Sequence, residues 1–436
     1  MNKSFKYFLS ITFSFYALVF TSETTTLESL WNFADNQNQG LLALQERQTG
    51  YAQNTKSALA HFAPSFKIEA QAQHLNSDLA IEIAPLKFST IIRQQDQWTA
   101  TAVILQPLFM GGKIKNGYQL SLEQQKLGQA EFAKSKSDLQ KEISKLYIQR
   151  LLLSQSILVR LESVALLQNY EQRAQTLMRQ GMIEPKILLQ AQMNLEDTKS
   201  ALSEDSAKVL ALDYVLSDLS GQKNINPQEN LPEPKIPNAP PQDWAQVTES
   251  PQVQLAQSQA NIAQKMSHIK SGEIWPEVAA FGRYELHKEA LTPFDPEWVV
   301  GIKATVPFKI TDYYSKSEAK SKAREAQFAL QMQKGQSQAL AIRFGLLAQS
   351  SAKRYYSNAL RDSLGQENHR LAKLKWEQGQ NSEVDAMDAA VQWHKARLER
   401  LQFAADAWAY YLEWAGQSGQ MKLWINTWNA ATHAHK

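Results

Sequence analysis

The sequence predicts a mainly α-helical fold with a small β part. Three observations support this: an order of elements that occurs twice, very long segments without proline, and short segments in which apolar and polar residues alternate. The repeated order is helix, two strands, very long helix, shorter helix. Apolar residues make up 43% of the 436 positions, which indicates a folded rather than a disordered chain.

We infer the internal repeat mainly from residues of the kind that interrupt helices and strands. Trp98 and Trp298 each stand nine positions before a proline, and the offset between the copies is 200. Further pairs keep the same order: Pro64 with Pro276, and Gly181 with Gly379. We therefore place a first repeat at 23–225 and a second at 245–416.

The elements follow in order from periodicity and from breakers. In the first repeat we expect a helix at Leu30–Phe62, strands at Ser65–His74 and Trp98–Phe109, a long helix at Lys113–Arg179 and a shorter helix at Pro185–Leu219. In the second we expect a helix at Pro251–Ser271, strands at Glu277–His287 and Glu297–Val306, a long helix at Asp312–Glu377 and a shorter helix at Ser382–Trp414.

The remaining segments lie before, between and after the repeats. Residues 1–22 combine Lys3 and Lys6 with a short apolar run, which indicates a cleaved signal peptide with an uncertain cleavage site. The linker at 226–244 is so rich in proline that no regular element is expected there, and it is either a disordered tether or a segment packed along the helices. The tail at 417–436 suggests no particular structure.

Charge and cysteine content exclude several classes of protein. Lys and Arg total 46 against 43 acidic residues, a balance that gives no case for binding nucleic acid. The chain has no cysteine, which excludes disulfides, thiolate metal sites and a catalytic thiol. No motif of an enzyme, a cofactor site or a metal site stands out, so we expect a protein without enzymatic activity.

The predicted strands have one apolar and one polar face. From Phe66 to Gln73, and again from Trp298 to Val306, apolar residues alternate with polar or small ones. The apolar face would meet a second sheet in a soluble sandwich, or lipid in an outer-membrane barrel. Trp98 and Trp298 fit an aromatic belt at a membrane interface, although tryptophans buried in a sandwich would give the same pattern.

The long helices favour a tube over a globular domain, although a solvated coiled coil would give the same helix pattern. The segment Lys113–Arg179, if unbroken, would be about 100 Å long. Its apolar residues follow a coiled-coil register at Leu139, Ile143, Leu146, Leu153 and Ile157. Four strands cannot close a membrane barrel alone, because such barrels begin at about eight strands and unpaired edges in lipid are costly. Several chains would therefore share one barrel.

The chain resembles the TolC-type outer-membrane efflux protein family. The resemblance covers Leu27 to Gly416 and rests on the signal-like start, the repeated element order, "LQPLFMGGKI" at Leu105–Ile114, and the two turn-and-helix segments around Gly181 and Gly379. It implies a homotrimer with a 12-stranded barrel in outer-membrane lipid and a periplasmic tube of helices. It also implies a periplasmic adaptor and an inner-membrane transporter, of RND or ABC type, as partners in efflux or type I secretion.

The resemblance also assigns roles to residues. It places the helix-tip turns at Gly181 with Pro185 and at Gly379 with Ser382, and the narrow periplasmic aperture at Asp385 and Asp388. A spacing of three puts these two carboxylates on one helix face, so three copies would present two stacked rings. On spacing alone, Asp385 is better explained as an acid in the first turn of a helix, and it is the resemblance that favours the aperture.

One feature of the family is missing. Members often pair an arginine after the second tip glycine with an aspartate after the first, but the chain has Asn381 and Ile187 at these positions. The closed state would then be held in another way, and Trp376 is either a residue of that junction or plain coiled-coil core. The alternative for the whole protein is a soluble exported coiled-coil structural or adaptor protein of the periplasm.

Overall fold

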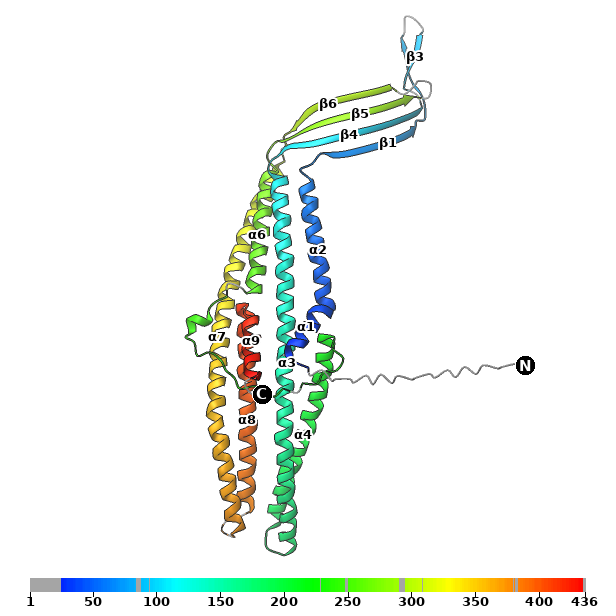
Figure 1. The fold of residues 1–436 in the computed structure, drawn as a ribbon. Helices are drawn as coiled ribbons and strands as arrows, with labels where there is room; N and C mark the ends of the chain where they lie inside the picture. The colour runs from blue at the N-terminus through cyan, green and yellow to red at the C-terminus, as the bar shows by residue number, and fades with distance from the viewer. Residues whose placement is uncertain are drawn as a thin grey trace, which may run out of the picture.

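A long bundle of helices carries a curved antiparallel sheet at one end (Figure 1). The computed structural model describes residues 25–433 except 84–87, 94, 228, 248–249, 290–294, 308, 379 and 381–382. The described strands are β1 (Ser65–His74), β2 (Leu79–Ile83), β3 (Phe88–Arg93), β4 (Asp96–Met110), β5 (Glu277–Glu289) and β6 (Asp295–Thr305). The described helices are α1 (Leu27–Gln37), α2 (Gln39–Ala60), α3 (Lys113–Arg179), α4 (Pro185–Ser220), α5 (Pro241–Trp244), α6 (Pro251–Gly272), α7 (Ile310–Glu377), α8 (Glu383–Ser418) and α9 (Met421–His433).

The main sheet has the strand order β1-β4-β5-β6, with every neighbouring pair antiparallel. Each repeat supplies one hairpin, and the two hairpins meet where β4 pairs with β5. The outer edges are β1 and β6. The mainly helical fold with a four-stranded sheet is thus confirmed.

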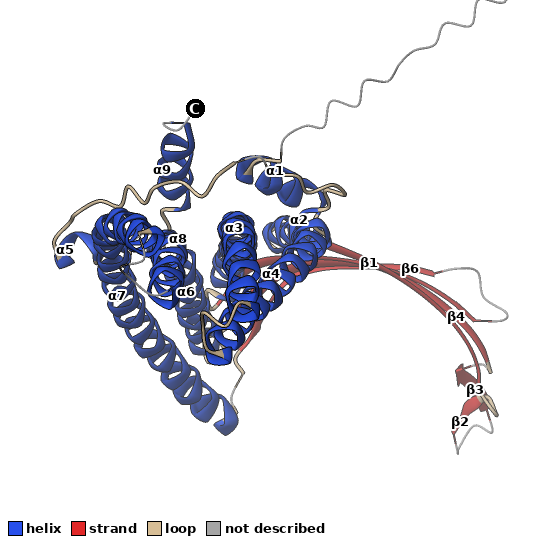
Figure 2. Cartoon of the chain, turned by 90° about the horizontal axis from the view of Figure 1, so that it is seen from below, coloured by secondary structure: helices blue, strands red, loops and turns tan. Residues whose placement is uncertain are grey.

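The helices stack in pairs end to end beside the two long rods. Helix α2 lies above α4 along α3, and α6 lies above α8 along α7, with the α3–α4 and α7–α8 hairpins reaching furthest from the sheet (Figure 1). Seen along the bundle, α1 and α9 cover the same side of it (Figure 2). The predicted long helix at Lys113–Arg179 has the predicted bounds, because no proline interrupts it.

Two glycines make the turn from β4 into α3. Gly111 and Gly112 have φ of +59° and +77°, a region that side chains with a Cβ rarely adopt. A Cβ on Gly111 would also lie 2.4 Å from the carbonyl oxygen of Gly272, at the end of α6. Lys113 and Glu277 form an ion pair at the same place. This junction therefore joins the two repeats immediately below the sheet.

The largest core lies midway along the helices. It contains side chains from α1, α3, α7, α8, α9 and the linker, among them the fully buried Trp408, Trp424, Trp428, Tyr147 and Tyr411. The indole of Trp428 lies 5.0 Å from that of Trp408 and 5.5 Å from that of Trp424. We call this group the equatorial cluster.

Three expectations of local structure were wrong, and one segment for which the sequence suggested nothing is structured. The single helix expected at Leu30–Phe62 is two helices, because Asn38 leaves the helical region and its side chain accepts from the backbone of Gly40 and Leu41. The loop after β1 contains the hairpin β2–β3, so the described part of the chain has strands beyond the four expected. The linker contains the short helix α5, because Pro241 occupies a first-turn position that tolerates proline. The tail, for which no structure was expected, forms α9.

The linker is packed rather than loose. Leu231, Trp244 and Val247 are each at most 8% exposed and belong to the equatorial cluster. The indole of Trp408 donates to the carbonyl oxygen of Pro232 at 3.0 Å. Of the two alternatives left open by the sequence, the segment packed along the helices is the one observed.

Candidate functional site: the sheet faces and the hairpin tips

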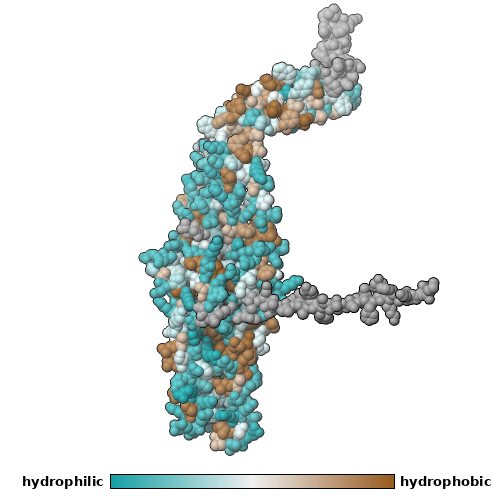
Figure 3. Space-filling model, viewed as in Figure 1, coloured by the Kyte–Doolittle hydropathy of each residue, from teal (hydrophilic) through white to brown (hydrophobic). Residues whose placement is uncertain are grey.

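The sheet separates apolar from polar side chains as the alternation predicts. Cross-strand partners share a face, and one such row joins Ile68, Ala102, Tyr284 and Trp298. Further apolar side chains follow at two-residue steps on this face: Phe66, Ile104, Val300 and Ile302. They are between 47% and 71% exposed, and brown apolar surface covers much of the visible sheet (Figure 3). No described element covers this face.

The opposite face of the sheet is polar away from the helices and mixed nearer to them, where Val103 and Val299 share a row with two cations. One cross-strand row contains Glu69, Thr101, Glu285 and Glu297. The next row toward the helices contains the cations Lys67 and Arg283, which form ion pairs with the glutamates two positions along their own strands. A surface of this kind is typical of a water-filled lumen.

The two predicted interface tryptophans lie on the apolar face. Trp98 pairs with Ala72 and Lys288, and Trp298 pairs with Tyr284. Their side chains are 59% and 71% exposed. They are therefore not the buried tryptophans of a sandwich, and a role at a membrane interface stays a prediction.

The first hairpin turn has the geometry that its sequence predicts. Gly181 has φ of +71°, and the backbone N–H of Met182 donates to the carbonyl oxygen of Leu177 at 2.9 Å, which ends α3. Pro185 then begins α4. The second predicted turn, at Gly379 and Ser382, lies outside the described residues.

Asp385 and Asp388 lie on the exposed side of the first turns of α8. Both residues are exposed, as are Gln392 and Lys395 further along the same stripe of the helix. The other side of α8 packs inward through Ala386, Met387 and Ala390. The structure thus brings the two carboxylates to one face. Their place at a pore stays a prediction, and the first-turn position of Asp385 also fits the helix dipole.

A second core holds the lower ends of the hairpins together. We call it the tip cluster, and its buried members are Leu167, Tyr170, Ala174, Leu188, Ala191, Leu195, Ala386, Met387 and Ala390. Trp376 packs against it, with its ring 6.0 Å from that of Tyr170 and the Arg173 guanidinium 4.9 Å from its centre. Trp376 therefore belongs to the junction between α3 and α7.

One buried acid near the tips was not predicted from the sequence. Glu383 is 6% exposed, and neither of its carboxylate oxygens has a hydrogen-bond partner among the residues that the structure describes. Burial raises the pKa of this carboxyl, while the charge of Arg173 acts in the opposite direction. Its place in "SEVDAMD" was the available signal, because a helix of this pattern must bury one of its acids if the other two face outward.

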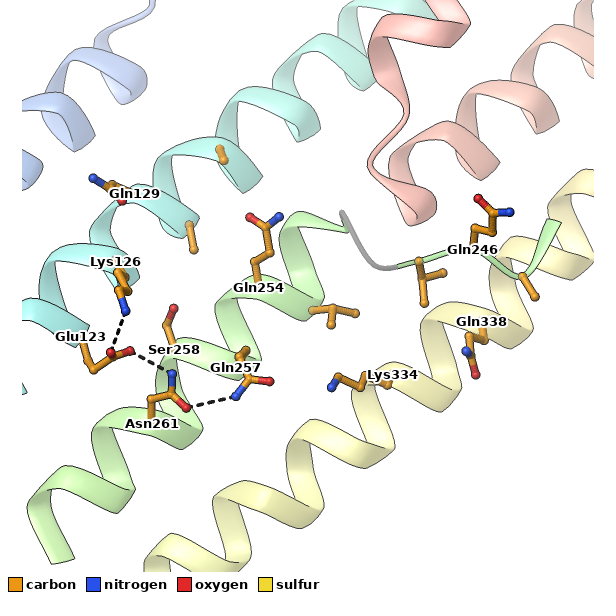
Figure 4. Close-up of a pocket in the computed structure, with 15 residues that line it drawn as sticks. Glu123, Lys126, Gln129, Gln246, Gln254, Gln257, Ser258, Asn261, Lys334 and Gln338 are labelled. Atoms are coloured by element: carbon orange, nitrogen blue, oxygen red, sulfur yellow. Dashed lines mark hydrogen bonds and ion pairs between the residues drawn. The ribbon is translucent and has the colours of Figure 1, made fainter. Parts of the chain in front are cut away.

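A cavity lies where α6 begins above the end of α8. It has a volume of about 1020 Å³ and is lined by α3, α6, α7 and residues 245–247, which follow the linker (Figure 4). Glu123 accepts from Lys126 and from Asn261, each at 2.9 Å, and Asn261 in turn accepts from Gln257 at 3.0 Å. Its polar lining is mostly amide side chains with few charges. Such a surface offers hydrogen bonds but no arrangement for nucleophilic or acid–base chemistry.

Two further features bear on function. Among the described residues no cluster of three or more His, Asp or Glu side chains could hold a metal ion. Within the same part of the chain, α3 alone is long and apolar enough to cross a membrane by length and composition. Because α3 contributes Ile143, Tyr147 and Leu151 to the equatorial cluster, we assign it to the bundle.

The comparisons with known proteins agree with this architecture. Residues 30–221 match the family model for outer membrane efflux protein. No curated protein matches the sequence. Among solved structures, the chain is similar to VceC from Vibrio cholerae, with 13% identity and a TM-score of 0.77 over 90% of this chain and 96% of that one.

Two more solved structures share the fold at similarly low identity. The Campylobacter jejuni CmeC outer membrane channel has 14% identity and a TM-score of 0.75, over 100% of this chain and 99% of that one. The outer-membrane channel OprN has 14% identity and a TM-score of 0.79, over 90% of each chain. The resemblance drawn from the sequence is confirmed: residues 30–221 match the outer membrane efflux protein family model, and the whole chain has the fold of these outer-membrane channels.

Proposed function

We propose that three copies of this chain form an outer-membrane duct for efflux, with a twelve-stranded barrel in lipid and the helices in the periplasm. The observation that carries the proposal is the four-stranded sheet, which has free edges at β1 and β6 and an apolar face that no described element covers. Each unpaired backbone group at such an edge costs several kcal/mol in lipid. Sister subunits would pair these edges, and the polar face would line the lumen.

The helices would continue the lumen as a tube and meet partners at the hairpin tips. The partners we propose are a periplasmic adaptor and an inner-membrane transporter of RND or ABC type, in efflux or type I secretion. The duct itself would do no chemistry and hold no cofactor. The amide-rich cavity and the scattered ion pairs of the bundle support a passive role, since they present no catalytic arrangement.

The assembly and the duct are tested together on detergent-extracted protein. Native mass measurement should give three chains per complex, and planar bilayers containing it should show ion conductance. A monomer that conducts nothing would refute the proposal. Cell fractionation separates the alternative: a soluble coiled-coil protein would stay in the periplasmic supernatant, and the duct would be found in the outer membrane.

The lipid-facing side of the sheet is tested by a pair of lysine substitutions on β6. Ile302 is 71% exposed on the apolar face, whereas Thr305 lies on the polar face. Ile302→Lys should cost about 2–4 kcal/mol if it faces the middle of the bilayer, and Thr305→Lys should cost little. The measurement is the yield of assembled trimer in the outer membrane. Equal yields for the two variants would contradict the assignment of the faces.

The aperture at Asp385 and Asp388 is tested by cation block of the conductance. Three pairs of carboxylates around a narrow passage would attract divalent cations. Asp385→Ala combined with Asp388→Ala should weaken block by divalent cations, while Asp406→Ala, higher on the same helix, should not. Unchanged block in the double variant would remove the aperture assignment and leave the duct standing.

A further inference from the structure

The α3–α4 and α7–α8 hairpins meet along a seam that is apolar at both ends and has polar side chains in its middle. The equatorial cluster closes the seam above, and the tip cluster closes it below. Between them lies a cavity of about 550 Å³ lined by α3, α7, α8 and the linker. Its polar lining includes Glu162, Asp362, Arg397 and Arg400. The middle of the seam therefore contains ion pairs and hydrogen bonds beside its apolar contacts, unlike the two ends.

Two histidines stack on one tryptophan at the lower end of this polar stretch. The ring of His369 lies 5.6 Å from that of Trp393 at an interplanar angle of 18°, and the ring of His394 lies 4.9 Å from it at 28°. The Trp393 indole N–H donates to Asp362 at 3.0 Å, which ties α8 to α7. His369 Nε2 lies 3.3 Å from the Tyr170 hydroxyl oxygen, which ties α7 to α3. We call this group the imidazole stack.

The ring nitrogens of His394 are buried without a partner among the described residues. The residue is 5% exposed, and in this part of the chain neither Nδ1 nor Nε2 has a hydrogen bond. An unsatisfied buried polar group is costly, and a buried cation without a partner is more costly still. This site thus tolerates the neutral imidazole and opposes the protonated one.

The charged groups around His394 do not offset this cost. Glu162 faces it from α3, Asp362 and His369 face it from α7, and Arg397 lies on its own helix. Glu162 is already paired with Arg397, and Asp362 already accepts from Trp393. Burial first, and then the charge of Arg397, lower the pKa of His394 to about 4. Burial likewise lowers the pKa of His369, helped by Lys373.

We propose that the imidazole stack is a proton-sensitive switch, which loosens the seam between the α3–α4 and α7–α8 hairpins when the periplasm becomes acidic. The inference rests on the proposed function, since parted hairpins would widen the lower end of the duct. In the parted form His394 reaches water, where an imidazole has a pKa of about 6.5. The parted form therefore binds protons more strongly than the closed form.

The direction and the size of the pH effect follow from the difference in the pKa of His394 between the closed and the parted form. Because the pKa is depressed in the closed form, closure is fully favoured above about pH 6.5 and is progressively lost as the pH falls toward 4. At pH 5.5 the ratio of parted to closed chains should rise about tenfold per chain relative to neutral pH. If three chains part together, the factor is about a thousand.

The test measures the separation of the two hairpin tips. The full-length chain has no cysteine, so Met182→Cys with Gln380→Cys places a spin label on each tip of the purified protein in lipid. Distances between labels are measured at pH 7.5 and 5.5. We expect a longer-distance population that grows on acidification and disappears when neutral pH is restored. An unchanged distance distribution would overturn the switch.

Variants identify the responsible group. His394→Phe keeps an aromatic ring on Trp393 but cannot titrate, so its distances should be the same at both pH values. Should this variant fail to assemble, His394→Gln provides the same test with a neutral polar side chain. The matched control is His268→Gln, because His268 is exposed on α6, and it should respond like the parent protein. A full response in either His394 variant would refute the assignment.

The label distances test the switch whether or not the protein forms a duct. A protein that conducts ions in bilayers but shows no change of tip distance would overturn the switch alone. Absence of conductance at neutral and at acidic pH would instead count against the duct, while the label distances would still report on the seam.

Discussion

Replacing Gly345 by alanine tests how firmly the linker is fixed to the bundle. An ideal Cβ on this α7 residue would lie 2.3 Å from Cδ2 of Trp244 and 2.5 Å from its Cγ. The Trp244 indole cannot yield easily: it is 2% exposed, donates to the carbonyl oxygen of Ala239 at 3.2 Å, and lies 4.9 Å from the ring of Trp414. The substitution must therefore displace the indole or the helix.

The matched control removes the effect of helix propensity. Gly335 also lies on α7, and nothing lies within 4 Å of a Cβ built on it. Either substitution gains up to about 1 kcal/mol from the better helix propensity of alanine. Overpacking at Gly345 costs about 1–3 kcal/mol, so Gly345→Ala should be less stable than Gly335→Ala by about this amount.

The assay combines thermal unfolding with proteolysis of the native protein. The midpoint of unfolding, followed by circular dichroism, should be lower for Gly345→Ala than for Gly335→Ala at the same protein concentration. Trypsin should also cleave the linker faster at Lys235, which is exposed, because a displaced Trp244 loosens the segment around it. Equal midpoints and equal cleavage rates would show that the linker is not wedged against α7, and would refute this reasoning.

Two further substitutions test the packing of the helices. Trp428→Ala should destabilise the protein by about 3–5 kcal/mol, because this α9 side chain is 1% exposed; Leu423→Ala, at 46% exposure on the same helix, should shift the unfolding midpoint little. Asp205→Asn should cost about 1–3 kcal/mol in urea unfolding, because it weakens a 2.7 Å contact with Arg160 that is only partly exposed to solvent. Glu204→Gln, at the exposed neighbouring position, should leave that midpoint unchanged.

The long helices were predictable because residues near their ends determine where they begin and end. Absence of proline, the turn at Gly181 and the proline at 185 define α3 and α4 closely. The break at Asn38 was missed because no proline marks it, and the capping amide acts only once the chain has turned. Helix α9 carried a usable signal, since Met421, Trp424, Ile425 and Trp428 follow helical spacing.

The candidate site was predictable only where it lies on a single element. The shared face of Asp385 and Asp388 follows from a spacing of three on one helix. The imidazole stack does not follow from any local pattern, because it depends on how α7 and α8 pack against each other and against α3. His369 and His394 are 25 positions apart, on opposite sides of the second hairpin turn. Only the register of the hairpin brings them to the same indole.

The distribution of apolar and polar contacts along the bundle indicates which part is fixed and which part moves. At the equator, the linker and α9 add buried tryptophans that belong to neither hairpin, so α3 and α8 are held there by elements outside themselves. Lower down, α3 contacts α8 through the ion pair of Glu162 with Arg397, and it contacts α7 where the Tyr170 hydroxyl meets His369 of the imidazole stack. Apolar packing is lost outright when helices separate, whereas water replaces the partners of an ion pair at little net cost. The equator holds the larger apolar core and is therefore the natural pivot, and parting of the hairpins below it also requires the smaller tip cluster to open.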